Sequence, residues 1–203
     1  MHFFIVGATG RVGKALLAAC TGHQVTALVR RETALPGATT VIGDVLDARA
    51  VARAITGDVI ITTVGGGTPK DPGKARSTGT QNLIAAARAH GISRIMAVVG
   101  AGVLLADATR MRHELAGYPS FLASLAAEHL AVYRALAGSE LDWTCICVPD
   151  ILDGGPTGTQ VAKRDYLPDG TGKITAGDIA AFIVREAMQP TYPRARVGLN
   201  TRS

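Results

Sequence analysis

The sequence predicts an α/β fold in which a mostly parallel, doubly wound sheet is covered by helices on both faces. Short apolar runs alternate with longer segments whose apolar residues recur at helical spacing, and this alternation covers most of the 203 residues. Only 18% of the residues are charged, against about 25% in an average soluble chain, which is typical of strands buried on both faces. The length favours a single domain over residues 1–203.

A first strand-helix-strand unit is predicted at the start of the chain. Residues 3–6 are an apolar run that ends at Gly7, and apolar residues then recur at helical spacing from residue 12 onward. Residues 25–29 are β-branched and apolar, which is typical of a second strand. Further strands are expected at 40–42, 59–64, 95–99 and 143–148, and further helices at 48–55, 74–90 and 123–136.

The pattern weakens after Asp150. Glycine and proline crowd between residues 153 and 172, which indicates a loop with a short strand at 160–166 as a cap over a ligand crevice. A small substrate cap is expected from about residues 105–122 and 150–172. Thr175 and Asp178 have the spacing of a helix N-cap and an acidic third residue, so a last helix is expected through Met188. Residues 196–199 are expected as a final edge strand.

Charge and cysteine content narrow the class of protein. The formal net charge is +5, but the basic residues are dispersed, so an anionic small molecule is expected as partner rather than nucleic acid. Three cysteines are expected as buried, reduced thiols of a cytoplasmic protein, either a monomer or a weak homodimer. No apolar run approaches the roughly 18 residues that cross a bilayer. The sequence predicts no signal peptide, no membrane partner and no metal site.

Three glycines between the first strand and the first helix form a candidate phosphate-binding turn. Gly7, Gly10 and Gly13 have the spacing G-x-x-G-x-x-G. The first lets the chain turn tightly, the second lets backbone approach a pyrophosphate, and the third lets the helix pack on the strand. Free N–H groups at the helix N-terminus then favour phosphate. In this context the turn predicts a dinucleotide-binding domain of the Rossmann type, with an ordinary tight turn as the alternative.

The end of the second strand favours NADP(H) over NAD(H). NAD-preferring sites carry a carboxylate here that accepts from the ribose 2′-hydroxyl, whereas this strand ends in Arg30 and Arg31. A guanidinium binds a 2′-phosphate bidentately. Arg31 also fits a solvated loop residue, and the neighbouring Glu32 weakens the distinction.

Residues after the third and fourth strands extend the candidate cofactor site. Asp44 is placed to accept from the adenine amino group, with Val45 against the ring; a helix cap for residues 48–55 is the alternative role of Asp44. Gly65 and Gly66 follow the fourth strand, where a side chain would obstruct the cofactor.

These motifs resemble those of the atypical short-chain dehydrogenase/reductases, and more narrowly the biliverdin-IX-beta reductase and NADH-flavin reductase family, also called NmrA-like. The likeness runs to about residue 188. The residues that carry it are Gly7-Ala8-Thr9-Gly10 with Gly13, Leu28-Val29-Arg30, Gly43-Asp44-Val45, Gln81-Asn82-Leu83-Ile84 with Ala89-His90-Gly91, Gly100-Ala101-Gly102 with Leu104-Leu105, and Asp142-Trp143-Thr144 with Pro149.

The resemblance implies roles for individual positions. It implies a pyrophosphate held by Gly7, Thr9, Gly10, Arg11 and Val12, a 2′-phosphate on Arg30, adenine at Asp44 and Val45, ribose beside Val64 and Gly65, and nicotinamide flanked by the bend at Gly100 and by Pro149, Asp150 and Ile151.

The chain departs from the family in its catalytic groups. None of Tyr118, Tyr133, Tyr166 and Tyr192 has the Lys four residues on that ordinary short-chain dehydrogenases use to lower the tyrosine pKa. The biliverdin reductases carry a serine after the fifth strand, where this chain has Gly100 and Ala101, and a histidine after the sixth, where it has Asp150. Alcohol dehydrogenase or sugar epimerase chemistry is therefore not expected.

The chemistry that remains is hydride transfer from NADPH to free flavin, a quinone or a biliverdin-like tetrapyrrole. Such a transfer needs chiefly two stacked flat rings, and the small residues at Gly100 and Ala101 permit stacking. A non-catalytic NADP(H)-binding redox sensor is the alternative. An epimerase- or dehydratase-like enzyme is a third, which would need Asp150 and His129 as its acid and base.

Further candidates lie on and before the helix 123–136. His129 and Tyr133 are four residues apart, so they share one face and would line the substrate mouth or donate a proton, unless His129 is structural. Residues 111–121, with His113, are a candidate substrate-facing flap. Arg110 and Arg112 would then meet an acidic acceptor, and a solvated loop is the alternative.

Overall fold

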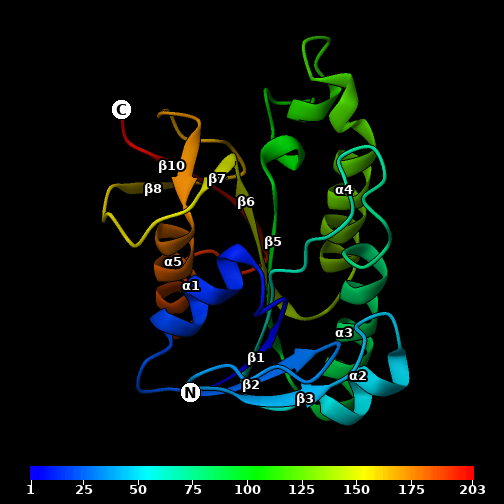
Figure 1. The fold of residues 1–203 in the computed structure, drawn as a ribbon. Coiled ribbons are helices and arrows are strands. Elements are labelled where there is room, and N and C mark those ends of the chain that lie inside the picture. Colours follow the sequence, from blue (N-terminus) through cyan, green and yellow to red (C-terminus); the bar gives the residue numbers. More distant parts are fainter.

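Eight strands form the main sheet of the computed structural model, which describes residues 1–203 (Figure 1). Their order is β3-β2-β1-β4-β5-β6-β10-β8, and every neighbouring pair is parallel except β10 and β8. The predicted mostly parallel, doubly wound sheet is confirmed. The strands are β1 (His2–Val6), β2 (Gln24–Val29), β3 (Thr39–Ile42), β4 (Val59–Thr62), β5 (Arg94–Gly100), β6 (Asp142–Val148), β8 (Gln160–Arg164) and β10 (Ala195–Thr201).

Helices cover both faces of this sheet. One face carries α1 (Arg11–Ala19) and α5 (Ala176–Met188), and the other carries α2 (Ala48–Ala54), α3 (Ser77–His90) and α4 (Ala123–Ala137) (Figure 1). In β1, Phe3 and Ile5 lie in the core under α1 and α5, whereas Phe4 and Val6 lie in the core on the α2–α4 side. Both faces of the central strands are therefore apolar, which explains the low charge content.

The end of β4 and the start of α3 differ from the predicted boundaries. Strand β4 ends at Thr62 rather than at residue 64, and α3 begins at Ser77 rather than at Lys74. The chain already turns before α3, because the N–H of Thr78 donates to the carbonyl of Lys74 at 3.0 Å. The last helix begins where it was predicted, since the Thr175 hydroxyl accepts from the N–H of Asp178.

The C-terminal strands correct two expectations. Strand β10 is not an edge strand, because β8 pairs with it on its free side. The segment 160–166 is therefore not a cap over a crevice, since Gln160–Arg164 completes the main sheet. Val197 and Leu199 on β10 are fully buried, and a strand this apolar needs a neighbour on both edges. A separate pair, β7 (Asp150–Leu152) and β9 (Lys173–Thr175), follows β6 and fixes the position of Asp150.

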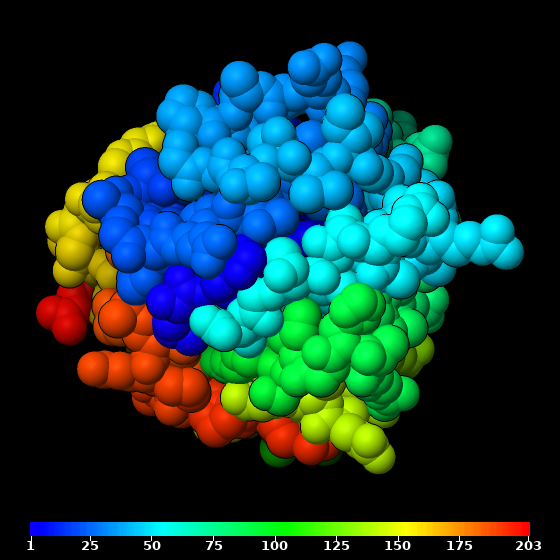
Figure 2. All heavy atoms as spheres, turned by 90° about the horizontal axis from the view of Figure 1, so that it is seen from below, coloured from blue at the N-terminus to red at the C-terminus, as the bar shows by residue number.

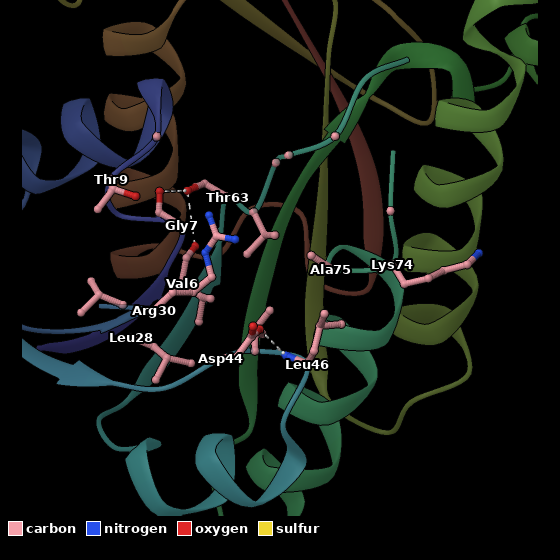
Figure 3. Close-up of a pocket in the computed structure, with 18 of the residues that line it drawn as sticks. Val6, Gly7, Thr9, Leu28, Arg30, Asp44, Leu46, Thr63, Lys74 and Ala75 are labelled. Atoms are coloured by element: carbon pink, nitrogen blue, oxygen red, sulfur yellow. Dashed lines mark hydrogen bonds between the residues drawn. The ribbon is translucent and has the colours of Figure 1, made fainter. Parts of the chain in front are cut away.

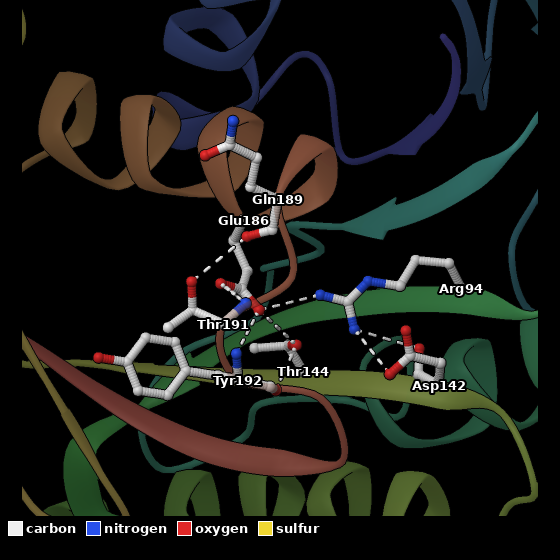
Figure 4. A network of polar contacts seen from close by, with 7 residues as sticks. All are labelled: Arg94, Asp142, Thr144, Glu186, Gln189, Thr191 and Tyr192. Carbon is white, nitrogen blue, oxygen red and sulfur yellow. Dashed lines mark hydrogen bonds and ion pairs between the residues drawn. The ribbon is translucent and has the colours of Figure 1, made fainter.

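A buried ion pair joins the starts of β5 and β6 to the end of α5 (Figure 4). The Arg94 guanidinium lies 3.1 Å from the Glu186 carboxylate and 3.2 Å from that of Asp142. Glu186 also accepts from the backbone N–H groups of Thr191 and Tyr192, at 2.9 and 2.8 Å. This network lies where the parallel strands begin, so it is remote from their carboxyl ends.

The start of the chain lies at the centre of the molecule's lower face. In Figure 2 the dark blue N-terminal residues lie between cyan and orange segments, as the central position of β1 in the sheet requires. Cys20, Cys145 and Cys147 are buried and free, as predicted. None of the helices has the length and apolar character needed to cross a membrane.

Candidate functional site

The glycine turn between β1 and α1 is built so closely that side chains would not fit. Gly7 has a φ of +91°, and a Cβ on it would lie 2.8 Å from the carbonyl carbon of Thr63. A Cβ on Gly13 would lie 2.1 Å from the carbonyl oxygen of Gly7. Glycine at these two positions therefore lets α1 begin directly against the end of β1.

Backbone donors at the start of α1 are available to an anion. The N–H groups of Arg11, Val12 and Gly13 have no acceptor in the protein, and no side chain caps the helix at Gly10. Three free N–H groups at the positive end of a helix dipole favour a phosphate group. This geometry fits the pyrophosphate of a dinucleotide.

A cavity of about 420 Å³ lies beside this turn, at the carboxyl ends of β1, β2, β3 and β4. Figure 3 shows Arg30 and Asp44 reaching into it from the ends of β2 and β3. The cavity lies where the strand order reverses between β1 and β4, which is the usual ligand position in such sheets. The predicted residues that line it are Gly7, Thr9, Gly10, Arg30, Asp44, Val45, Val64, Gly65 and Gly66.

Asp44 is not the cap of α2. The helix is capped by Asp47, whose carboxylate accepts from the N–H groups of Arg49 and Ala50. One carboxylate oxygen of Asp44 accepts from the N–H of Leu46 at 2.9 Å, and the other has no partner in the protein. The cap alternative was therefore wrong, because the helix begins one turn later than that role requires, and Asp44 keeps a free acceptor in the cavity.

A second cavity of about 580 Å³ adjoins the first at the ends of β5 and β6. Thr63, Val64 and Gly65 line both, so the two cavities are adjacent. The predicted residues that line the second cavity are Arg11, Val12, Val64, Gly65, Gly100, Ala101, Arg112, His129, Pro149, Asp150 and Ile151. The two segments expected to flank a nicotinamide ring, the bend at Gly100 and the segment that begins at Pro149, therefore line the same cavity.

His129 holds the end of β5 in place. Its Nδ1 accepts a hydrogen bond from the N–H of Gly100 at 3.1 Å, and a Cβ on Gly100 would lie only 2.8 Å from the same atom. Burial, helped by the nearby Arg76 charge, lowers the pKa of His129 to about 4. The ring is therefore neutral near pH 7, with its proton on Nε2, because Nδ1 serves as the acceptor.

Other sequence candidates lie outside the cavities. Tyr133 packs edge-on against the Trp143 ring, with the Arg196 guanidinium 4.6 Å from its own ring centre, and does not line the mouth as expected. Sharing a helix face with His129 does not bring it to the site, because the cavity is near only the first turns of α4. Arg31 is exposed and lines neither cavity. Arg110 pairs with Asp107 at 2.6 Å.

The structure adds residues that the sequence did not single out. Arg76 lines the second cavity and donates to the carbonyls of Gly66 and Pro72, at 3.0 and 3.2 Å. Burial lowers the pKa of Arg76, an effect that the Glu128 carboxylate opposes. Tyr118 also lines this cavity, together with Arg112, which was a candidate on the predicted flap at residues 111–121. No local motif marks Arg76 or Tyr118, because each reaches the cavity through the path of a loop.

The fold and the site define a dinucleotide-binding protein of the Rossmann type. The chain belongs to the NAD(P)H-binding family, whose model matches residues 7–190. Membership of this family supports the binding of a nicotinamide cofactor.

Reductases recur among the relatives. A Streptomyces protein named 3-diazoavenalumate denitrifying reductase is 30% identical, over 87% of this chain and 67% of its own length. A solved Streptococcus pneumoniae structure, a candidate NADH-flavin reductase, has a TM-score of 0.87 and 25% identity over all of both chains. ChuY, an anaerobilin reductase from Escherichia coli O157:H7, has a TM-score of 0.78 and 25% identity over 99% of this chain and 97% of its own. The predicted resemblance to flavin and tetrapyrrole reductases is confirmed.

Proposed function

We propose that this chain is an NADPH-dependent reductase that transfers a hydride to free flavin or to a similar conjugated acceptor, such as a quinone or a tetrapyrrole. The observation that carries the proposal is that the two cavities lie side by side and share Thr63, Val64 and Gly65 as lining residues. A dinucleotide bound along them would reach from Arg30 to Gly100. When bound, NADPH supplies the hydride, and the rest of the second cavity is left to the acceptor.

The walls of the second cavity suit a flat acceptor. Gly100 and Ala101 present little side chain, and Leu122, Leu125 and Leu167 add apolar surface. His129 accepts from the N–H of Gly100, so a side chain of α4 holds this wall in place. Orientation of two rings against such a wall supports hydride transfer without a Tyr-x-x-x-Lys pair.

Arg30 supports a preference for NADP(H). It lines the first cavity and takes part in no ion pair, so its guanidinium is free to bind a 2′-phosphate. A cytoplasmic location belongs to the same proposal, supported by three free cysteines. A monomer or weak homodimer remains our expectation.

The epimerase-like alternative is disfavoured by His129. Its Nδ1 already accepts from Gly100, and the pKa of about 4 makes the ring a weak base. Asp150 lines the same cavity, but it would lack a matched partner.

The test is an acceptor panel with purified protein and NADPH. FMN, a quinone and biliverdin are added separately, and acceptor-dependent loss of NADPH is followed by absorbance. We expect oxidation above the protein-free rate with at least one of them. Tight NADPH binding with no oxidation by any acceptor would instead favour the redox-sensor alternative.

A further inference from the structure

Two polar side chains in the second cavity have no partner in the protein. The guanidinium of Arg112 takes part in no ion pair. Its neighbour Arg110, by contrast, is neutralised by Asp107 at 2.6 Å. The Tyr118 hydroxyl makes no hydrogen bond within the protein. Since both residues line the cavity, their unused donors are available to a molecule that binds there.

The segment that carries these side chains is firmly attached to the site. The N–H of Arg112 donates to the carbonyl of Leu104 at 2.8 Å, and His113 Nδ1 lies 3.0 Å from the carbonyl of Gly102. The Tyr118 ring packs edge-on against His113. A Cβ built on Gly102 would lie 2.7 Å from the Tyr118 hydroxyl oxygen, so this hydroxyl lies directly over the bend that follows β5.

We propose that Tyr118 donates the proton that completes acceptor reduction, and that Arg112 anchors an anionic group of the acceptor. This inference rests on the proposed function and narrows its substrate class. The acceptor is then a conjugated molecule with a carboxylate or a phosphate, and it needs one proton after it has received a hydride.

The step balances with Tyr118 as the acid. The hydride brings two electrons and one hydrogen, which leaves a negative charge on the acceptor. The Tyr118 O–H bond breaks and its proton forms the second new bond on the acceptor. Water then reprotonates the phenolate, so NADPH, acceptor and one proton give NADP⁺ and the dihydro-acceptor.

The surroundings of Tyr118 suit this role. Burial raises the pKa of Tyr118, an effect that the Arg112 charge opposes, so the hydroxyl is protonated and ready to donate at neutral pH. The same positive charge stabilises the phenolate after donation.

The first experiment substitutes Tyr118→Phe, with Tyr192→Phe as the matched control. Tyr192 packs on Phe182 in the opposite part of the fold and lines neither cavity. For Tyr118→Phe we expect kcat to fall by about 100-fold, with unchanged acceptor KM and NADPH affinity. An unchanged kcat would overturn the donor role. A native protein that reduces no acceptor would overturn it together with the proposed function.

The second experiment tests the anchor by binding alone. FMN and riboflavin share one ring system and differ by a phosphate, and biliverdin and its dimethyl ester differ by charge on the carboxylates. In protein saturated with NADP⁺, Arg112→Ala should weaken binding of the charged member of a pair by about 10-fold or more and leave the neutral member unchanged. Loss with FMN points to phosphate, and loss with biliverdin points to carboxylate.

Arg110→Ala is the control, because this arginine is on the same segment but is already paired. Equal binding of charged and neutral members by the native protein would overturn the anchor. Because these binding measurements need no turnover, they test the role of Arg112 even if the protein reduces none of the acceptors in the panel.

Discussion

Adjacent arginines at the end of β2 have different surroundings. Arg30 lines the first cavity, whereas Arg31 is exposed and lines none. The sequence placed both near a 2′-phosphate, because the path of the chain after a strand cannot be read from residue type. Arg30 is therefore the candidate contact for the 2′-phosphate, and Arg31 is a neighbouring arginine that serves as a control.

Arg30→Ala should weaken NADPH binding by about 10- to 100-fold, since charge-assisted hydrogen bonds to a phosphate would be lost. NADH binding should change little, and Arg31→Ala should leave both affinities near native. Nucleotide fluorescence titrations of the three proteins measure this. Equal losses for NADPH and NADH would contradict a 2′-phosphate role for Arg30.

His129 should make folding stability depend on pH. Its pKa is about 4 when folded, against the ordinary histidine value of 6.5. As pH falls from 6.5 towards 4, the unfolded chain takes up a proton that the folded chain does not, so stability falls by up to about 3 kcal/mol. The loss in native protein should exceed the loss in His129→Gln, measured by urea unfolding across this range. Parallel curves would count against a buried neutral ring.

At the scale of elements, the Arg94 network holds strand starts and a helix end together. Its two carboxylates differ in exposure, since the side chain of Glu186 is 2% exposed and that of Asp142 is 37% exposed. The same guanidinium therefore offers a buried and a partly solvated ion pair for comparison.

Glu186→Gln should lower the free energy of unfolding by about 3–5 kcal/mol, because it leaves the Arg94 charge buried without its main partner. Asp142→Asn should cost less than about 1 kcal/mol, because water can solvate that side. Denaturant unfolding of both variants gives the two values. Similar losses would show that burial does not set the strength of these contacts.

Local sequence patterns predicted where the strands lie along the chain better than they predicted which strands pair. Strands β1, β2, β4, β5 and β6 were visible as apolar runs, since burial on both faces fixes their composition. The pairing of β8 with β10 was not visible, because it depends on which edge is left free after the sheet has formed. The same limit explains why the sequence favoured Tyr133, and not Tyr118, as a residue of the site. Helical spacing favoured Tyr133, whereas the loop that carries Tyr118 to the cavity has no period.

At the scale of the whole molecule, the cofactor should stabilise the fold. The candidate site joins the ends of β1, β2, β4 and β5 with the start of α1, so an unfolded chain has no such site. NADPH at about 100 times its Kd should add about 2.7 kcal/mol, which corresponds to roughly 5–10 °C in Tm for a domain of this size.

Differential scanning fluorimetry measures this shift. Arg30→Ala at the same NADPH concentration should show a smaller one, because a lower affinity means less saturation. The absence of any shift in native protein, with intact folding by circular dichroism, would contradict a preformed dinucleotide site.

The two edge strands of the main sheet, β3 and β8, limit self-association in different ways. Strand β3 is only four residues long, and β8 ends in the exposed, charged pair Lys163 and Arg164. A short or charged edge gives another chain little to pair with, whereas the apolar β10 without β8 would be a template for aggregation. The antiparallel strand β8 therefore covers the apolar edge that β10 would otherwise offer to another chain.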